Sequence, residues 1–286
     1  MIRTGKIAEV KKYVREWKRQ GLTIGLVPTM GYLHEGHASL IRRAREDNDR
    51  VIVSDFVNPI QFGPKEDLAV YPRDFEADCK LCDSLGADLI FHPEPDEMYA
   101  PDACTHVKVD NLTDNLCGVT RPFHFQGVCT VVSKLFHISE ADRAYFGQKD
   151  AQQLAVIRRM VRDLNFPIEI IGCPIIREED GLAKSSRNTY LNAEERKAAT
   201  ILYKALKKGH EMIDAGETDA AKVKDTIRSI IGTEPRATID YVEIVDRDEL
   251  QPIETIDRPV LAAVAVYIGK DRLIDNFITG SLNEKE

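Results

Sequence analysis

Two histidines lie three residues apart in a loop where the sequence predicts that a strand gives way to a helix. His34 and His37 follow the apolar run LTIGLVP and stand at the start of the amphipathic stretch ASLIRRARE. At this spacing both imidazoles can face one side of a helix start, where unpaired N–H groups and the helix dipole favour an anion. The pair therefore indicates a phosphate site, although two surface histidines on an ordinary loop would have the same spacing.

The glycines around these histidines exclude another kind of phosphate loop. Gly31 and Gly36 have the spacing of the pattern G-x-x-x-x-G-K-[ST], but His37 and Ala38 replace its lysine and its hydroxyl residue. The chain also lacks the G-x-G-x-x-G dinucleotide fingerprint. The two glycines would instead let the backbone approach a ligand closely.

Two further segments place cations in polar turns. Residues 147–150 (GQKD) follow the strand-like run RAYF, so Lys149 would set a point charge where a strand ends and a helix begins. Asp150 and Gln153 equally resemble a capping box, which needs no ligand. Residues 184–187 (KSSR) offer two cations and two hydroxyls that could wrap phosphates, and a solvated loop is the alternative.

The order of apolar and amphipathic stretches indicates how these segments are positioned. Strand-like runs such as LTIGLVP, RVIVSDFV and ADLIFHP alternate with stretches of helical length. The runs carry few polar residues, as in a parallel sheet whose two faces are both covered. We therefore expect an α/β fold with a Rossmann-like parallel sheet and helices on both faces, with ligand-binding loops at the carboxyl ends of its strands.

The pattern of alternating strand-like and helical stretches ends near residue 175. A polar stretch leads into charged helices over roughly residues 193–231, and three strand-like runs follow: ATIDYVEIV, VLAAVAVYI and RLIDNFIT. We expect a Rossmann-like domain over residues 1–175 and a smaller α+β domain over residues 176–286 that carries the KSSR segment.

Composition excludes several classes of protein. With 39 Lys and Arg against 47 Asp and Glu, the net charge of −8 argues against a nucleic-acid partner. The longest apolar run, residues 260–269, is too short to cross a membrane, and the amino terminus has no signal-peptide pattern. The irregular spacing of the six cysteines does not resemble a disulfide framework, which favours reduced thiols in a cytoplasmic protein. Cys79 and Cys82 form a single C-x-x-C without the second pair that a zinc site needs.

Several motifs resemble one enzyme family. HEGH at residues 34–37 resembles the H-x-G-H motif of the nucleotidyltransferase superfamily, and KSSR resembles its K-M-S-K-S loop. VPTMGYLHEGH, FVNPIQF, FGQKDAQQL and DGLAKSSRNTYL are closer still to pantothenate synthetases. The resemblance runs from about Leu22 to Leu191. It implies ATP-dependent joining of pantoate to β-alanine through a pantoyl adenylate, with AMP and pyrophosphate released, Mg²⁺ on the triphosphate, and a homodimer.

The resemblance also implies roles for individual residues. His37 would donate a proton, with His34 beside it on the phosphates and Lys149 on charged oxygens. Gln61 and Gln153 would bind pantoate through their amides. The implied ATP-binding set is Met30, Gly31, Tyr32, Leu33, His34, Glu35, Gly36, His37, Gly147, Gln148, Lys149, Asp150, Ile176, Lys184, Ser185, Ser186 and Arg187.

The chain departs from the family pattern at five positions. Asp55 and Lys184 replace residues that are usually apolar, and Phe123 replaces one that is usually small. Gln126 stands where a basic residue is frequent, and Gln148 where glutamate is common. These departures concern the fit of the substrate pocket and of the KSSR segment.

Two other functions compete with a ligase. A nucleotidyltransferase that keeps the nucleotide in its product would use the same phosphate-binding residues, but FVNPIQF with Gln153 favours a small hydroxy acid. A non-catalytic nucleotide-binding module would need only glycine turns and a lysine. The paired histidines argue against that module.

Overall fold

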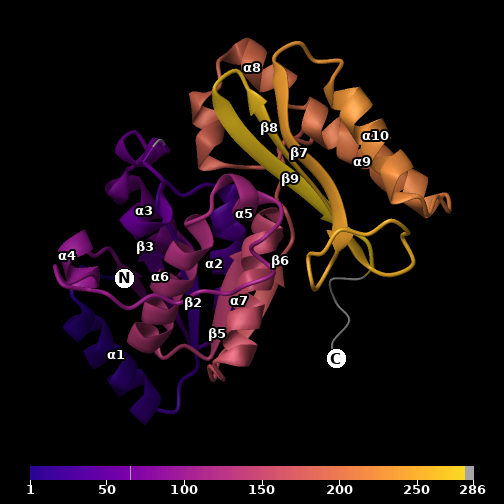
Figure 1. Cartoon of the computed structure of the whole chain (residues 1–286). Helices are drawn as coiled ribbons and strands as arrows, with labels where there is room; N and C mark the ends of the chain where they lie inside the picture. Colours follow the sequence, from indigo (N-terminus) through magenta and orange to yellow (C-terminus); the bar gives the residue numbers. More distant parts are fainter. Residues whose placement is uncertain (65, 281–286) are drawn as a thin grey trace. The chain divides into compact units, whose positions relative to one another are not determined.

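The computed structural model describes residues 1–64 and 66–280, which form two compact units (Figure 1). Unit 1 consists of Met1–Asp110, Arg121–Gln148 and Val156–Pro174, and unit 2 of Asn111–Thr120, Lys149–Ala155 and the chain from Ile175 onward. The chain thus passes between the units several times. The division into domains at 175/176 stays a prediction.

Unit 1 contains a parallel sheet of six strands, which confirms the predicted α/β class. The strands lie in the order β1-β4-β3-β2-β5-β6. The order reverses between β2 and β5, and at such a point the loops after the two strands diverge and leave room for a ligand. The strands are β1 (Ile2–Thr4), β2 (Ile24–Thr29), β3 (Arg50–Asp55), β4 (Leu89–Phe91), β5 (Arg143–Gly147) and β6 (Glu169–Cys173).

Helices cover both faces of this sheet (Figure 1). Helix α2 packs on β2, β3 and β5 and contacts α3, while α6 packs on β2 and contacts α1. Helix α1 buries Val10, Val14 and Trp17, at the four- and three-residue spacing that places side chains on one face. The helices are α1 (Ile7–Arg19), α2 (Glu35–Asp47), α3 (Phe75–Ser84), α4 (Pro95–Met98), α6 (His124–Ser139) and α7 (Ala151–Asp163), with short 3₁₀ turns η1 (Pro59–Gln61), η2 (Asp67–Ala69) and η3 (Gln148–Asp150). Most of η3 and the first five residues of α7 belong to unit 2.

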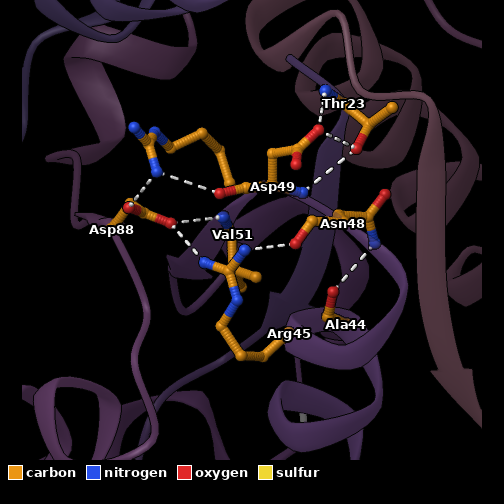
Figure 2. Close-up of polar contacts among 8 residues, drawn as sticks. Thr23, Ala44, Arg45, Asn48, Asp49, Val51 and Asp88 are labelled. Atoms are coloured by element: carbon orange, nitrogen blue, oxygen red, sulfur yellow. Dashed lines mark hydrogen bonds and ion pairs between the residues drawn. The ribbon is translucent and has the colours of Figure 1, made fainter.

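A polar network fixes the amino-terminal edge of this sheet (Figure 2). The Asp49 carboxylate accepts hydrogen bonds from the N–H and hydroxyl of Thr23, at 2.9 and 2.8 Å. Asp88 accepts from the N–H of Val51 at 2.8 Å and pairs with Arg45 at 2.9 Å. These contacts therefore join the starts of β2 and β3 to the end of α2 and to the residue that precedes β4.

Unit 2 is built on an antiparallel sheet with the order β7-β8-β9, formed from the three predicted runs. Val260, Val264 and Ile268 of β8 lie in one apolar core with residues of α9 and α10. The strands are β7 (Ala237–Asp246), β8 (Val260–Ile268) and β9 (Asp271–Ile278); the helices are α5 (Cys117–Thr120), α8 (Ala193–Ala198), α9 (Ile201–Asp214) and α10 (Ala220–Ile231), with the 3₁₀ turn η4 (Ser186–Tyr190).

The other face of this small sheet is contacted by the two segments that precede residue 175. The Cys117 sulfur lies 3.4 Å from the Tyr241 hydroxyl, and Asn276 donates to the Lys149 carbonyl at 2.9 Å. Tyr241 and Asn276 pair across the sheet with Ala265 and Ala263, so all four belong to the face opposite the α9 and α10 core. Residues 111–120 and 149–155 therefore complete unit 2.

The cysteine pair of the lone C-x-x-C serves the core of unit 1. Cys79 and Cys82 lie on α3, fully buried among apolar residues of β2, β3 and α2. Burial raises the pKa of the Cys82 thiol to about 12, and it also raises the pKa of Cys79. Both thiols are therefore protonated and unreactive near neutral pH.

Candidate active site

The chain makes a sharp turn between β2 and α2, at residues 30–34, which we call the β2–α2 turn. Gly31 and Tyr32 both have positive φ, at 78° and 52°. The Gly31 N–H donates to the Thr29 hydroxyl at 3.1 Å, and that hydroxyl donates to the Ser54 carbonyl at 2.7 Å. The turn is therefore attached to the ends of both β2 and β3.

His34 and His37 cap the first turn of α2 reciprocally. The Gly36 N–H donates to Nδ1 of His34 at 3.1 Å, and the His34 N–H donates to Nδ1 of His37 at 3.3 Å. The ring centroids are 4.1 Å apart. Because each Nδ1 accepts a hydrogen bond, the neutral tautomer of each ring carries its proton on Nε2. Each imidazole can therefore offer an Nε2–H donor while its other nitrogen holds the helix start.

The helix begins at Glu35, before the amphipathic stretch ASLIRRARE, which starts at Ala38. The reason is the cap itself, since His34 takes the N-cap position with extended backbone. Ser, Thr, Asp and Asn are the usual residues at that position. An imidazole nitrogen performs the same function here, and standard sequence rules do not anticipate it.

A buried carboxylate on α3 also contacts the β2–α2 turn. Asp78 accepts hydrogen bonds from the N–H groups of Tyr32 and Leu33, both at 2.6 Å, one on each oxygen. Burial raises the pKa of Asp78 to about 6, and the nearby Asp55 carboxylate adds to the rise while the two N–H donors oppose it. Sequence reasoning missed Asp78, because a helical position in an acidic stretch carries no local signal for this contact.

Gln61 and Met30, two predicted site residues, meet in unit 1. Gln61 is buried at the end of η1, and its Nε2 donates to the Met30 sulfur at 3.1 Å. Its Oε1 accepts from Nδ2 of Asn58 at 2.9 Å, and Oδ1 of Asn58 accepts from the Tyr99 hydroxyl at 2.7 Å. This chain of hydrogen bonds fixes the orientation of the Gln61 amide.

Helix α6 packs against η1 at a glycine. A Cβ added to Gly127 would lie 2.5 Å from the Ile60 carbonyl oxygen and 2.6 Å from Cα of Gln61. Both neighbours are backbone atoms, so they can yield only if η1 moves. The Gly127 carbonyl also accepts from Nδ2 of Asn58 at 3.2 Å.

We therefore expect Gly127→Ala to destabilise unit 1 and displace Gln61. Overpacking costs about 1–3 kcal/mol, which exceeds the gain of up to about 1 kcal/mol from replacing a helical glycine. Urea unfolding should show a net loss of about 1–2 kcal/mol. Gly232→Ala is the control, since Gly232 follows the last residue of α10 and the nearest atom to its added Cβ is the carbonyl oxygen of Arg228 in that helix, at 3.2 Å. Equal effects of the two changes would contradict this account.

The GQKD segment is shared between the two units. Gln148, at the end of unit 1, is buried, whereas Lys149 and Asp150 belong to unit 2. The Lys149 side chain is 21% exposed, and its Nζ lies 3.6 Å from Asp150. Asn276 of β9 fixes the Lys149 backbone through its carbonyl. Lys149 therefore combines a fixed main chain with an ammonium that is loosely paired with Asp150 and also interacts with the buried Asp275 carboxylate.

Gln153 is half-buried near the start of α7, and the adjacent Gln152 makes the hydrogen bonds that hold this part of unit 2 together. Gln152 is buried, accepts from the Cys117 N–H at 2.9 Å, and donates to the carbonyls of Leu112 and Asn115 at 2.9 and 2.8 Å. The Gln152 amide thus joins α7 to residues 111–120. Sequence reasoning did not distinguish the functions of these adjacent glutamines.

The KSSR segment follows a short hairpin in unit 2. Ile176 accepts a hydrogen bond from the Lys184 N–H at 2.9 Å through its carbonyl, and Lys184 Nζ pairs with Glu178 at 2.8 Å. Ser185 caps η4 by accepting from the Arg187 N–H at 3.3 Å. The expected cation at Lys184 is thus in an ion pair that an incoming phosphate would have to displace.

The base of this hairpin is attached to β9. Arg177 makes a paired contact with the buried Asp275 carboxylate at 2.6 and 2.9 Å, and it donates to the Gly181 carbonyl at 3.0 Å. Its guanidinium also lies 4.5 Å from the centroid of the Tyr203 ring. Adjacent residues of β9, Asp275 and Asn276, therefore contact the hairpin and Lys149. Neither was identified from the sequence, because the contacts join segments about a hundred residues apart.

The predicted site residues consequently form two groups, one in each unit. Convergence of the two groups on one nucleotide stays a prediction. Unit 1 contains Met30, Gly31, Tyr32, Leu33, His34, Glu35, Gly36, His37, Gln61, Gly147 and Gln148, and unit 2 contains Lys149, Asp150, Gln153, Ile176, Lys184, Ser185, Ser186 and Arg187.

The part of the chain that the structure describes contains neither a metal-binding cluster of side chains nor a helix that could span a membrane. Within residues 1–64 and 66–280, no group of three or more His, Cys, Asp and Glu side chains could hold a metal ion. None of the helices in that part of the chain combines the length and apolar character needed to cross a lipid bilayer.

Comparison with known proteins gives a consistent family. A family model described as pantoate-beta-alanine ligase matches residues 3–278. The pantothenate synthetase of Clostridium acetobutylicum is 64% identical over 271 residues, which cover 95% of this chain and 96% of the relative. That of Clostridium novyi is 63% identical over 278 residues, covering 97% and 98%.

Solved structures agree with the sequence relatives. The crystal structure of pantothenate synthetase from Thermus thermophilus has a TM-score of 0.92 and 46% identity, covering 97% of this chain and 99% of that one. The crystal structure of pantoate-beta-alanine ligase from Francisella tularensis, complexed with beta-gamma ATP and beta-alanine, has a TM-score of 0.79 and 33% identity, covering 98% and 99%.

Proposed function

Since the chain belongs to the pantoate–β-alanine ligase family, we propose that it condenses pantoate with β-alanine through a pantoyl adenylate, releasing AMP and pyrophosphate. The observation that carries this proposal is the reciprocal imidazole cap at the carboxyl end of β2, beside the contact between Met30 and Gln61. The cap places two Nε2–H donors at a helix start, where phosphate is favoured. The Gln61 amide is oriented to bind hydroxyl or carboxylate groups. The Francisella tularensis ligase is complexed with beta-gamma ATP and beta-alanine, which supports ATP as the co-substrate of this chain.

The proposed reaction needs charge stabilisation more than a covalent nucleophile. A pantoate carboxylate oxygen attacks the α-phosphorus of ATP, the bond to the pyrophosphate oxygen breaks, and a mixed anhydride results. The amine of β-alanine then attacks the acyl carbon, AMP leaves, and the nitrogen loses a proton. Negative charge develops on phosphate oxygens in the first step, so donors fixed in advance lower its barrier.

We assign the donors as follows. His37 and His34 contact the phosphates through Nε2–H, and Lys149 supplies a positive charge to the same group. Gln61 and Gln153 hold pantoate in line with the α-phosphorus. The hairpin and its KSSR segment close over the departing pyrophosphate, and Lys184 exchanges Glu178 for a phosphate as they do so.

We propose Mg²⁺ as the companion of the triphosphate. The described residues do not build a cation site of their own. Mg²⁺ is usually held by substrate phosphates with one or two carboxylates rather than by a protein cage. When bound it neutralises phosphate charge. No metal ligands are assigned to side chains.

The remaining expectations are proposals of the same kind. Residues 1–175 would form the nucleotide- and pantoate-binding domain, and residues 176–286 the domain that carries the KSSR segment. We propose a homodimer in the cytoplasm, which the six unpaired cysteines suit. Light scattering on the purified chain would measure the assembly.

Isotope transfer tests the adenylate directly. With pantoate labelled by ¹⁸O in its carboxylate, one label should appear in the phosphate of AMP, because that oxygen bridges the anhydride and leaves with AMP. Mass spectrometry of the nucleotide and pyrophosphate measures this. Release of ADP and labelled inorganic phosphate, or a product that retains AMP, would refute the proposed function. Omission of pantoate is the control and should abolish AMP release.

A further inference from the structure

Two buried carboxylates lie against the same residue of the β2–α2 turn. A Cβ added to Gly31 would lie 2.3 Å from Oδ1 of Asp55 and 3.3 Å from Oδ2 of Asp78. Both aspartates are only 3% exposed. They come from different elements, Asp55 from the end of β3 and Asp78 from α3. Two acidic side chains from different elements therefore pack against this turn.

The turn needs such support because its conformation is intrinsically unfavourable. Gly31 tolerates its positive φ, but a left-handed conformation at a residue such as Tyr32 costs about 1–2 kcal/mol. Such residues persist where the surroundings fix them. Consecutive N–H groups in this arrangement form a concavity that binds an anion. The N–H groups of Tyr32 and Leu33 both donate to Asp78, which therefore occupies this concavity with its carboxylate.

We propose that Asp78 is a positioning residue for His34 and His37, and that the adjacent Asp55 raises the pH below which Asp78 loses its hold on the turn. The inference rests on the proposed function. An ionised Asp78 accepts both N–H groups, one on each oxygen, and so fixes the two residues directly before His34. A protonated Asp78 has one hydroxyl and one carbonyl oxygen, so it loses one of the two acceptors.

Charged and titratable groups on α3 and on the segment after β4 face this pair. Asp74 and the thiols of Cys79 and Cys82 lie on or beside α3, and each interacts with one or both carboxylates. His92 follows β4, and its Nδ1 lies 2.8 Å from the backbone carbonyl oxygen of Asp55 and 3.5 Å from the side-chain Oδ1 of Asp55. The hydrogen bond to Asp55 raises the pKa of His92. Among the described residues, Oδ2 of Asp55 has no hydrogen-bond partner.

The direction of the pH effect follows from burial. Since the pKa of Asp78 is raised to about 6, chiefly by burial and then by Asp55, the carboxylate loses its charge as the pH falls through that value. Its ordinary value is near 3.9, so ionised Asp78 disfavours the folded state above about pH 4 and acidification relieves that cost. A loss of function near pH 6 from this group should therefore occur without loss of stability.

The test compares Asp78→Asn with Asp55→Asn from pH 5 to 8, with ATP affinity measured by calorimetry and AMP formation by chromatography. Wild type should show an acid limb near pH 6. Removing the charge of Asp55 should move that limb to lower pH, because a like charge no longer opposes ionisation. Removing the Asp78 carboxylate should abolish the limb and raise the KM for ATP about tenfold at pH 8, because asparagine lacks the charge and keeps only one of the two acceptors.

Asp49→Asn is the matched control. Asp49 also accepts a backbone N–H in unit 1, but at the amino-terminal edge of the sheet (Figure 2), so its profile should equal that of wild type. An unchanged limb in both Asp55→Asn and Asp78→Asn would overturn the inference. So would a raised Mg²⁺ requirement in Asp78→Asn, which would assign this carboxylate to the cation. Absence of AMP formation by the wild-type chain would instead refute the proposed function. In that case the ATP affinities of wild type and Asp78→Asn, measured by calorimetry, would still decide whether Asp78 positions the turn.

Discussion

Replacing His37 with alanine should lower the rate of AMP formation by about 10²-fold or more while both units stay folded. The substitution removes one Nε2–H donor and the Nδ1 acceptor of the His34 N–H. Loss of a helix cap costs about 0.5–2 kcal/mol, which a chain with two apolar cores should withstand. Loss of a donor to a developing phosphate charge acts on the transition state, so kcat should fall more than the KM for ATP rises.

His210→Ala is the matched control for this prediction. His210 is half-buried like His37, lies 4.7 Å from the Phe277 ring and 3.7 Å from Asp214, and has no place in the predicted site. Its loss should leave turnover near that of wild type. Circular dichroism and urea unfolding establish that both variants are folded. Turnover of His37→Ala within threefold of wild type would remove His37 from the mechanism, where roughly 10²-fold is expected.

The sheet of unit 1 could be predicted because its signal is local. Strands buried on both faces are continuous apolar runs, and the intervening helices have their own periodicity. The runs LTIGLVP and RVIVSDFV became β2 and β3, paired in parallel from Ile24 with Arg50 to Thr29 with Asp55. The spacing of His34 and His37 likewise depends only on one helix start. Neither inference needed knowledge of distant contacts.

The support beneath the site could not be predicted in this way. Asp78 and Tyr32 are 46 residues apart, and Asn276 and Lys149 are 127 apart. Each contact depends on how helices and strands pack in three dimensions, which no local spacing records. The sequence shows that Asp55 departs from the family pattern, but only the structure shows that its carboxylate lies against Gly31.

The set of chain segments that make up unit 2 could not be predicted from local sequence patterns either. The three strands were recognised from their runs, but a sheet with one apolar face covered by α9 and α10 needs a cover for the other. Residues 111–120 and 149–155 supply it through Cys117, Gln152 and Lys149. The segment that begins with Lys149 therefore has a packing role as well as its predicted chemistry.

Replacing Lys149 with methionine should lower AMP formation by about 10²- to 10³-fold. Methionine keeps an apolar stem of similar length but removes the charge, so packing is altered less than electrostatics. The ammonium lies 3.6 Å from Asp150, a pair that is too loose to hold much energy at a partly exposed position. The charge is therefore available to a phosphate, whereas the backbone is fixed by Asn276.

Lys224→Met separates the position of the charge from the loss of a lysine. Lys224 Nζ lies 3.1 Å from Glu243, and its side chain is 22% exposed, against 21% for Lys149. Both belong to unit 2, and each faces a carboxylate. If a charge anywhere in unit 2 sufficed to attract ATP, the two variants would lose turnover equally. If Lys149 acts on the phosphates, only its loss should slow AMP formation, and the unfolding midpoints of the two variants should differ little.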